Sequence, residues 1–125
     1  MFKPGTRYSR KDIYDELGGS KVSCLPMKDG AIVAACLLKS FSPEAPQVML
    51  CGVGPRTTPV SEQLTQHLTP LPIFIKQAAN QWEYAGMFKV VESLHDGARF
   101  EQFIAGSGRK KSDVSFVVRF KRVDG

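Results

Sequence analysis

The sequence predicts a mixed α+β fold, in which a small and strongly bent β-sheet or open β-barrel is flanked by short helices. Five or six stretches have the composition of strands, and short helical patterns lie among them. The strand spacing is too irregular for a series of β-α-β units. With 125 residues the chain can bury one core, so we expect a single domain over residues 1–125.

A short helix is expected to begin after Ser9 and to end at the double glycine 18–19. Ser9 and Asp12 are three residues apart, and both side chains can accept hydrogen bonds from backbone N–H groups that lack a partner in the first turn. Ile13 and Leu17, four residues apart, place an apolar stripe against a core. The pattern alone also fits an ordinary amphipathic helix with solvated charges.

Two apolar runs, 30–38 and 47–53, are predicted to be buried strands. They are separated by a proline-rich loop at 42–46, so we expect them to pair as neighbours. A second short helix is predicted from Thr58-Pro59 up to Pro70, with apolar residues at helical spacing: Val60, Leu64 and Leu68.

The second half of the chain predicts three strands and a third short helix. The strands are 71–76, 82–91 and the stretch after Asp113, in which Val114, Phe116, Val118 and Phe120 are expected to face inward and Ser115, Arg119 and Lys121 outward. Gly86 lies within the second of these strands and indicates a bulge or a close backbone approach. Phe100, Phe103 and Ile104 predict a helix that ends near Gly106.

The composition is that of a soluble globular domain. The hydrophobic content of 42% argues against disorder, and no apolar run approaches the roughly 20 residues that a membrane helix needs. No secretion signal is evident, so we expect an intracellular protein. The three cysteines (Cys24, Cys36 and Cys51) are widely spaced and are predicted to be reduced core thiols rather than zinc ligands or disulfides.

Groups for catalysis are sparse, and the sequence predicts no catalytic residue, metal site or cofactor. His67 and His95 lie far apart and have no ligand partner at helical spacing. The acids of the opening helix could hold magnesium, but no lysine stands on a strand near them as nuclease chemistry would require. The glycine-rich turn 52–56 lacks the Lys-Ser or Lys-Thr ending of a phosphate loop.

Positive charge gathers toward both chain ends, within a net charge of +5. If the ends converge in space, they form a basic face suited to a phosphate backbone. The same charges could also be an ordinary solvated surface. The phosphate-binding candidates are Arg7, Lys11, Arg109, Lys110, Lys111, Arg119 and Lys121.

Aromatic residues near these charges suggest a pocket for a flat base. Trp82 and Tyr84 share one strand face, which would suit stacking, although such a pair is also typical of a core. Tyr8 and Tyr14 flank the opening helix and add to the aromatic supply.

Three sequence segments resemble the SRA-like domains of bacterial HNH-type restriction endonucleases. The first is Pro4-Gly5 with Tyr8, Arg10, Asp12-Ile13 and Gly18-Gly19. The others are the strand pattern Trp82-x-Tyr84-x-Gly86-x-Phe88-x-Val90 and the ending Ser107-Gly108-Arg109 with Asp113-Val114. SRA-like domains belong to the wider PUA-like group, so the resemblance implies a small bent barrel and a reader of modified cytosine that rotates the base into an aromatic pocket. It also implies the candidates for this base pocket: Tyr8, Ser9, Arg10 and Asp12 near its mouth, and Trp82 and Tyr84 as the stacking rings.

We therefore expect a non-catalytic module that binds double-stranded DNA carrying a modified base. No HNH segment is present, so cleavage would come from a nuclease partner or from a region outside this chain. Two alternatives stay open: a PUA-like domain that binds RNA or a nucleotide-like ligand, and a protein-interaction domain whose basic surface meets an acidic partner.

Overall fold

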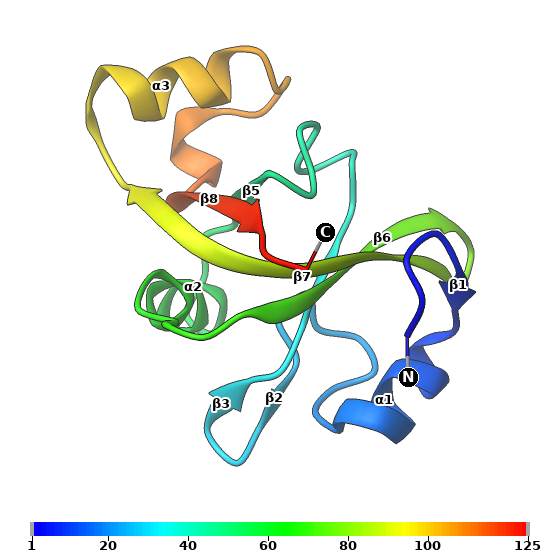
Figure 1. The fold of residues 1–125 in the computed structure, drawn as a ribbon. Coiled ribbons are helices and arrows are strands. Elements are labelled where there is room, and N and C mark those ends of the chain that lie inside the picture. Colours follow the sequence, from blue (N-terminus) through cyan, green and yellow to red (C-terminus); the bar gives the residue numbers. More distant parts are fainter. Residues whose placement is uncertain (1, 125) are drawn as a thin grey trace.

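A computed structural model describes residues 2–124 and shows a curled, mixed six-stranded sheet that forms an open half-barrel (Figure 1). The strand order is β4 (Ala35–Leu37), β6 (Leu71–Ala78), β7 (Gln81–Leu94), β8 (Phe116–Arg122) and β5 (Val48–Cys51), and β1 (Arg7–Tyr8) pairs with β7. β4 and β6 are parallel, and the other pairs are antiparallel. A separate hairpin joins β2 (Met27–Lys28) to β3 (Ala31–Ile32). The predicted α+β class with a bent sheet is confirmed.

Three short helices cover different parts of the sheet (Figure 1). They are α1 (Arg10–Leu17), α2 (Thr57–Thr65) and α3 (Gly97–Ala105), and a single 3-10 turn follows at η1 (Lys111–Asp113). Leu64 of α2 belongs to the main core, whereas Phe100 and Ile104 of α3 pack on Val117 in a separate cluster. In the described part of the chain no helix is long and apolar enough to cross a bilayer.

The capping pattern of α1 forms as predicted. The Ser9 hydroxyl accepts from the Asp12 N–H at 3.0 Å, and the Asp12 carboxylate accepts from the Ser9 N–H at 3.0 Å. At the other end the chain turns at Gly18, where φ is +77°, a conformation that glycine adopts without strain. Ile13 is buried against β6 and β7, so the helix is held by its apolar face.

The expected strand over 30–38 is broken, and its predicted pairing with 47–53 is wrong. Residues 31–32 belong to the small hairpin, and Val33 donates to the carbonyl of Pro26, which directs the chain away before β4 begins. β4 then pairs with β6 and β5 pairs with β8, so the two strands lie at opposite edges of the sheet. Both strands are buried throughout, so their sequences carry no alternation that could specify a partner.

The predicted irregularity at Gly86 is confirmed. The pairing of β6 with β7 shifts between Ile73 and Phe74, which leaves Ala85 as an extra residue next to Gly86. Gly86 has φ of +127°, and a Cβ atom there would lie 2.6 Å from Nε of Arg122. Glycine therefore serves both the backbone conformation and the close approach.

Two expectations about exposure need correction. Val117, between the predicted inward residues of β8, is itself fully buried beneath α3, so both faces of this strand are covered there. α2 ends at Thr65, and Leu68 is 82% exposed, because the last periodic apolar position lies beyond the helix.

The start of α2 also differs from the expected start at Thr58-Pro59. The helix begins at Thr57, and the Thr58 hydroxyl accepts from the Gly54 N–H. α3 forms and ends before Gly106 as expected.

Candidate binding cavity

A cavity of about 330 Å³ lies where the two edges of the curled sheet, β4 and β5, approach each other. Leu37 of β4 and the pair Met49 and Leu50 of β5 form its apolar walls. The segment 20–24 covers part of β4, because the carbonyl of Cys24 accepts from the Cys36 N–H at 2.7 Å. β4 and β5 do not pair with each other, so the half-barrel has an open seam between them, and the cavity lies at this seam.

Arg10 lines this cavity and is the buried cation of the structure, with only 8% of its surface exposed. Its Nη2 donates to the carbonyls of Ser20 and Ser23 at 2.8 and 2.9 Å. Its Nε is buried and has no hydrogen-bond partner among the described residues. Arg10 therefore holds the covering segment in place and brings a positive charge to the cavity wall.

Trp82 lines the same cavity, but its ring is already in contact with cations. The guanidinium of Arg10 lies over the indole at 5.2 Å from the ring centre, and the ammonium of Lys76 lies over it at 5.8 Å. The ring is 8% exposed. Trp82 thus packs in a core cluster with Phe74, as its core interpretation predicts, and it also borders the cavity.

Phe41 is a cavity residue that the sequence reasoning missed. Its side chain is 54% exposed, and the guanidinium of Arg109 lies over the ring at 5.1 Å. Arg109 is fixed by bonds to the carbonyls of Asp113 at 3.1 Å and Leu50 at 3.3 Å. The sequence signal that could have found it is an aromatic residue within the turn-forming stretch Ser-Phe-Ser-Pro, which favours an exposed loop. Phe41 and Arg109 form the partly exposed rim of the cavity, which Arg10 and Trp82 also line.

The three cysteines differ in exposure. Cys36 and Cys51 are free and buried as predicted, and burial raises the pKa of each thiol to about 12. Cys24 is exposed, which corrects its expected place in the core, and it lines the cavity together with Cys36. Its apolar surroundings raise the pKa of the Cys24 thiol as well.

Four of the six residues predicted for a base pocket lie away from the cavity. Ser9 and Asp12 are engaged in the cap of α1, and the Ser9 N–H and hydroxyl lower the pKa of the Asp12 carboxyl. Tyr8 packs edge-on against Phe2, and Tyr84 lies 5.3 Å from Phe74 between ring centres. Burial raises the pKa of the Tyr84 hydroxyl. The cavity brings together Arg10 and Trp82, while the other four belong to the packing around α1 and β1.

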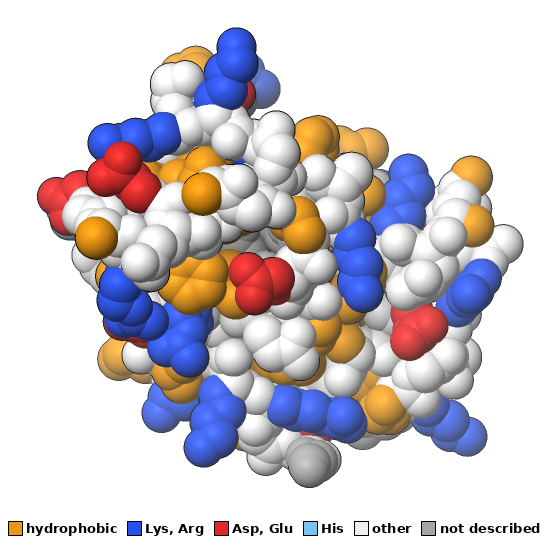
Figure 2. Space-filling view, turned by 90° about the horizontal axis from the view of Figure 1, so that it is seen from above, with side chains coloured by type: hydrophobic (Ala, Val, Ile, Leu, Met, Phe, Trp, Pro, Cys, Tyr) orange, Lys and Arg blue, Asp and Glu red, His pale blue; other side chains and the backbone are white. Residues whose placement is uncertain are grey.

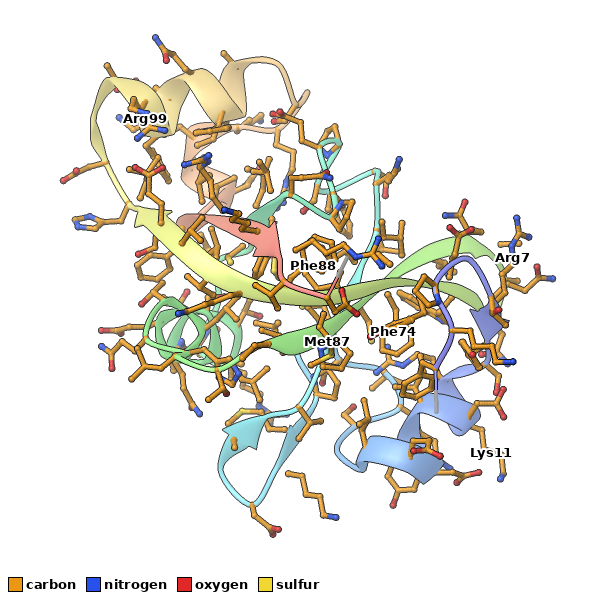
Figure 3. All side chains as sticks on the ribbon, viewed as in Figure 1. Arg7, Lys11, Phe74, Met87, Phe88 and Arg99 are labelled. Atoms are coloured by element: carbon orange, nitrogen blue, oxygen red, sulfur yellow. The ribbon has the colours of Figure 1, made fainter. Side chains whose placement is uncertain are left out.

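The predicted phosphate-binding residues do not form one compact patch. Arg7 and Lys11 project near β1 and α1 (Figure 3), whereas the segment 109–111 follows α3, which lies at the opposite end of the molecule from α1 (Figure 1). Figure 2 likewise shows Lys and Arg side chains round the rim of one face, several of them along its lower margin. Lys110, Lys111 and Lys121 are exposed, and Lys121 stands opposite Lys89 in the register of β7 and β8.

Several of these cations have local partners. Arg7 donates to Gln81 at 2.8 Å, and Lys11 pairs with Asp15 at 2.7 Å. Arg119 pairs with Glu92 at 2.7 Å. The chain ends do come close along β7, since the Gly5 N–H donates to Tyr84 and the Val123 N–H donates to Met87. The basic segment 109–111 lies elsewhere, since Arg109 lines the cavity and donates to the carbonyl of Leu50 in β5.

Among residues 2–124, no group of three or more His, Cys, Asp or Glu side chains is arranged to hold a metal ion. His95 lies 3.6 Å from the Asp96 carboxylate on the surface, and partial burial lowers the pKa of His67. Apolar side chains together with two arginines, Arg10 and Arg109, line the cavity.

The curled half-barrel with its three short helices is an SRA-like fold. The chain is similar to the SRA domain in a crystal structure of the SUVH5 SRA domain in complex with methylated CHH DNA, with a TM-score of 0.62 over 99% of this chain and 90% of that chain. The sequences are 14% identical, so the likeness is one of fold. No family model matches the sequence, and no curated protein matches it.

Proposed function

We propose that this protein is a non-catalytic DNA-binding module that accepts a modified base, rotated out of the duplex, in the cavity between β4 and β5. The observation that carries the proposal is the cavity itself, at the unclosed seam of a fold shared with a domain that was crystallised on methylated DNA. Its volume of about 330 Å³ is at the lower end of the range for small-ligand sites, roughly 300–1,000 Å³, which suits one base.

The lining supplies what a flipped base needs. Removing a base from the stack costs a few kcal/mol, and contacts in the pocket must offset that loss. Stacking of a base on an aromatic ring contributes about 1–3 kcal/mol. Phe41 offers an exposed ring at the rim, and Trp82 contributes a largely buried ring to the wall. Of the residues predicted from sequence, Arg10 and Trp82 are thus the ones that we retain for the base.

The phosphate backbone would be met by exposed cations around the cavity. Arg109 lies at the rim, and Lys110 and Lys111 follow it directly in an exposed turn. Each phosphate that is neutralised adds about −0.9 to the slope of log affinity against log salt for duplex DNA. We propose a modest slope, because the cations are dispersed and several are paired with acids. Any cleavage of bound DNA would require a separate nuclease.

Binding to matched duplexes tests the proposal. The duplexes differ at one position (cytosine, 5-methylcytosine, 5-hydroxymethylcytosine or a glucosylated base), and anisotropy of a labelled strand gives the affinity near physiological salt. Trp82 is the only tryptophan, so its fluorescence reports occupation of the cavity directly. Tighter binding of one modified duplex with a change in Trp82 emission supports base reading.

Two variants locate the site. Phe41→Ala removes the exposed ring at the rim and should weaken the preferred duplex about 5- to 100-fold, the equivalent of one lost stacking contact. Leu68→Ala removes an apolar side chain that is even more exposed and lies outside the cavity, so it should leave affinity unchanged. Equal, weak and steeply salt-sensitive binding of all duplexes would reject base reading and favour a protein or RNA partner.

A further inference from the structure

The cavity carries positive charge that no acid neutralises. Arg10 and Arg109 line it, and neither aspartate nor glutamate is found among its described lining residues. On the outer surface of β7 and β8, by contrast, arginines pair with Glu92 and Asp124. An exposed cation is solvated by water, but Arg10 is 8% exposed, so its charge is largely removed from water.

The contacts of Arg10 compensate its burial only in part. The side-chain hydrogen bonds to Ser20 and Ser23 both leave from Nη2 and end on carbonyls, and Nε has no acceptor within the described chain. The indole of Trp82 adds a cation–π contact. A buried charge without a counter-ion is unfavourable, and the charge of a guanidinium is delocalised over its three nitrogens. An anion in the cavity would therefore be attracted to the whole group.

The remaining polar side chains of the cavity also favour an acceptor. Ser42 is buried, and its hydroxyl accepts from the Leu50 N–H at 3.0 Å, which leaves the hydroxyl hydrogen available to a ligand. Arginine can only donate. The exocyclic amine of cytosine is a donor too. Facing Arg10, Arg109 and Ser42, that amine would find no side-chain carboxylate to accept its hydrogens, whereas an oxygen-bearing substituent would be matched.

We infer that the cavity holds its ligand through an oxyanion placed against Arg10. This inference rests on the proposed function and specifies its ligand: a pyrimidine that carries a carboxylate at its fifth position. The same chemistry would be supplied by the phosphate of a free nucleotide. Arg109, at the rim, contributes a second positive charge to the same space.

Two ligand series separate these sources of the oxyanion. The first compares duplexes with cytosine, 5-methylcytosine or 5-carboxylcytosine at one position, measured by anisotropy at fixed salt. The second compares deoxycytidine, its 5-carboxyl derivative and deoxycytidine monophosphate, measured by Trp82 fluorescence. A hydrogen bond to a charged group favours the carboxyl duplex by roughly 10- to 100-fold over the methyl duplex.

Arg10→Gln should abolish this preference, and Arg7→Gln is the matched control. Arg7 lies on β1 three residues earlier, is exposed, and donates to Gln81 outside the cavity. Its loss should weaken all three duplexes alike and keep their ratio. Because Arg10 also holds the segment 20–24, the thermal melting of each variant is measured, and Arg109→Gln provides a second test in which that segment is untouched.

Each result of these measurements supports or contradicts the inference. Preference for the carboxyl duplex that is lost in Arg10→Gln and reduced by less in Arg109→Gln supports the inference, whereas a preference reduced only in Arg109→Gln places the oxyanion at Arg109 and overturns it. If only the monophosphate binds, and binds through Arg10, the oxyanion is a phosphate: the proposed flipping of a base and the 5-carboxylpyrimidine both fail, and only the contact of an oxyanion with Arg10 stands. If neither a carboxylate nor a phosphate raises affinity, the inference is overturned, even where a methylated duplex still binds and the proposed function holds.

Discussion

Replacement of Gly86 by alanine should destabilise the protein by about 1–3 kcal/mol, the usual cost of holding a residue with a side chain in a sparsely populated backbone region. Its φ of +127° is one that L-residues rarely adopt. The added Cβ would also lie 2.6 Å from Nε of Arg122 and 3.0 Å from Oδ1 of Asp124. Those two side chains form an ion pair at 2.9 Å, and Asp124 also accepts from the Met87 N–H.

The crowding and the backbone strain can be separated. Arg122 has a flexible chain, so it can yield, and we expect the greater part of the loss to come from strain. Arg122→Ala in the Gly86→Ala background should recover about 0.5–1 kcal/mol, the coupling expected of residues in contact. Gly97→Ala is the control for strain alone, because φ there is +89° and no atom lies within 4 Å of the added Cβ.

Urea unfolding followed by Trp82 fluorescence gives these free energies, and thermal melting should fall by about 4 °C for each kcal/mol. The reasoning would be refuted by a loss below about 0.5 kcal/mol in Gly86→Ala, since neither the strain nor the bulge would then matter to stability. A loss equal to that of Gly97→Ala, with no coupling to Arg122, would refute the crowding alone.

Two further predictions concern titratable groups. Ser9→Ala should cost about 1 kcal/mol through loss of the cap and should raise the pKa of Asp12 only part of the way toward its ordinary value, because the backbone N–H of residue 9, the larger cause of the lowering, stays in the variant. Because the folded pKa of Asp12 is lowered, its stabilising effect is present above the ordinary carboxyl pKa and is lost as pH falls through the folded pKa. NMR titration of the Asp12 carboxyl in the wild-type protein and in Ser9→Ala measures the two pKa values. An identical pKa in both proteins would contradict the role of the Ser9 hydroxyl. Alkylation by iodoacetamide at mildly alkaline pH should modify Cys24 alone in the folded protein, because Cys36 and Cys51 are buried with pKa values of about 12. Peptide mass spectrometry reads the sites; a duplex bound in the cavity should slow the reaction at Cys24, and equal rates at the three thiols would show that the core opens readily.

Elements with a strong local pattern were predicted well from sequence. The cap at Ser9 and Asp12 specifies α1 through contacts within one turn, and the alternation from Trp82 onward specifies β7 through one buried face. Gly86 was informative because glycine within a strand calls for a backbone reason. In each case the physical cause lies within a few residues of the signal.

The pairing of β4 and β5 and the position of Arg10 depend on contacts far apart in sequence. Uniformly apolar strands indicate burial but do not indicate a pairing partner. The two runs were therefore predicted to pair because they are neighbours along the chain, whereas in the structure β4 pairs with β6 and β5 pairs with β8. Arg10 was predicted for the pocket through resemblance, but its burial requires the carbonyls of Ser20 and Ser23 to fold over it. Phe41 gave no periodic signal, since it lies in a loop.

The open seam separates the specificity of the cavity from the stability of the sheet. The ladder bonds of β6, β7 and β8 do not pass through the cavity, whereas two of its walls come from the segment 20–24 and the loop after β4. Loops tolerate changes of length and sequence that strands in mid-sheet do not. Except at Ser42, whose hydroxyl accepts from the Leu50 N–H of β5, substitutions in these two segments can therefore alter which ligand fits without removing a hydrogen bond of the half-barrel, so the scaffold is well suited to diversification by evolution or by design.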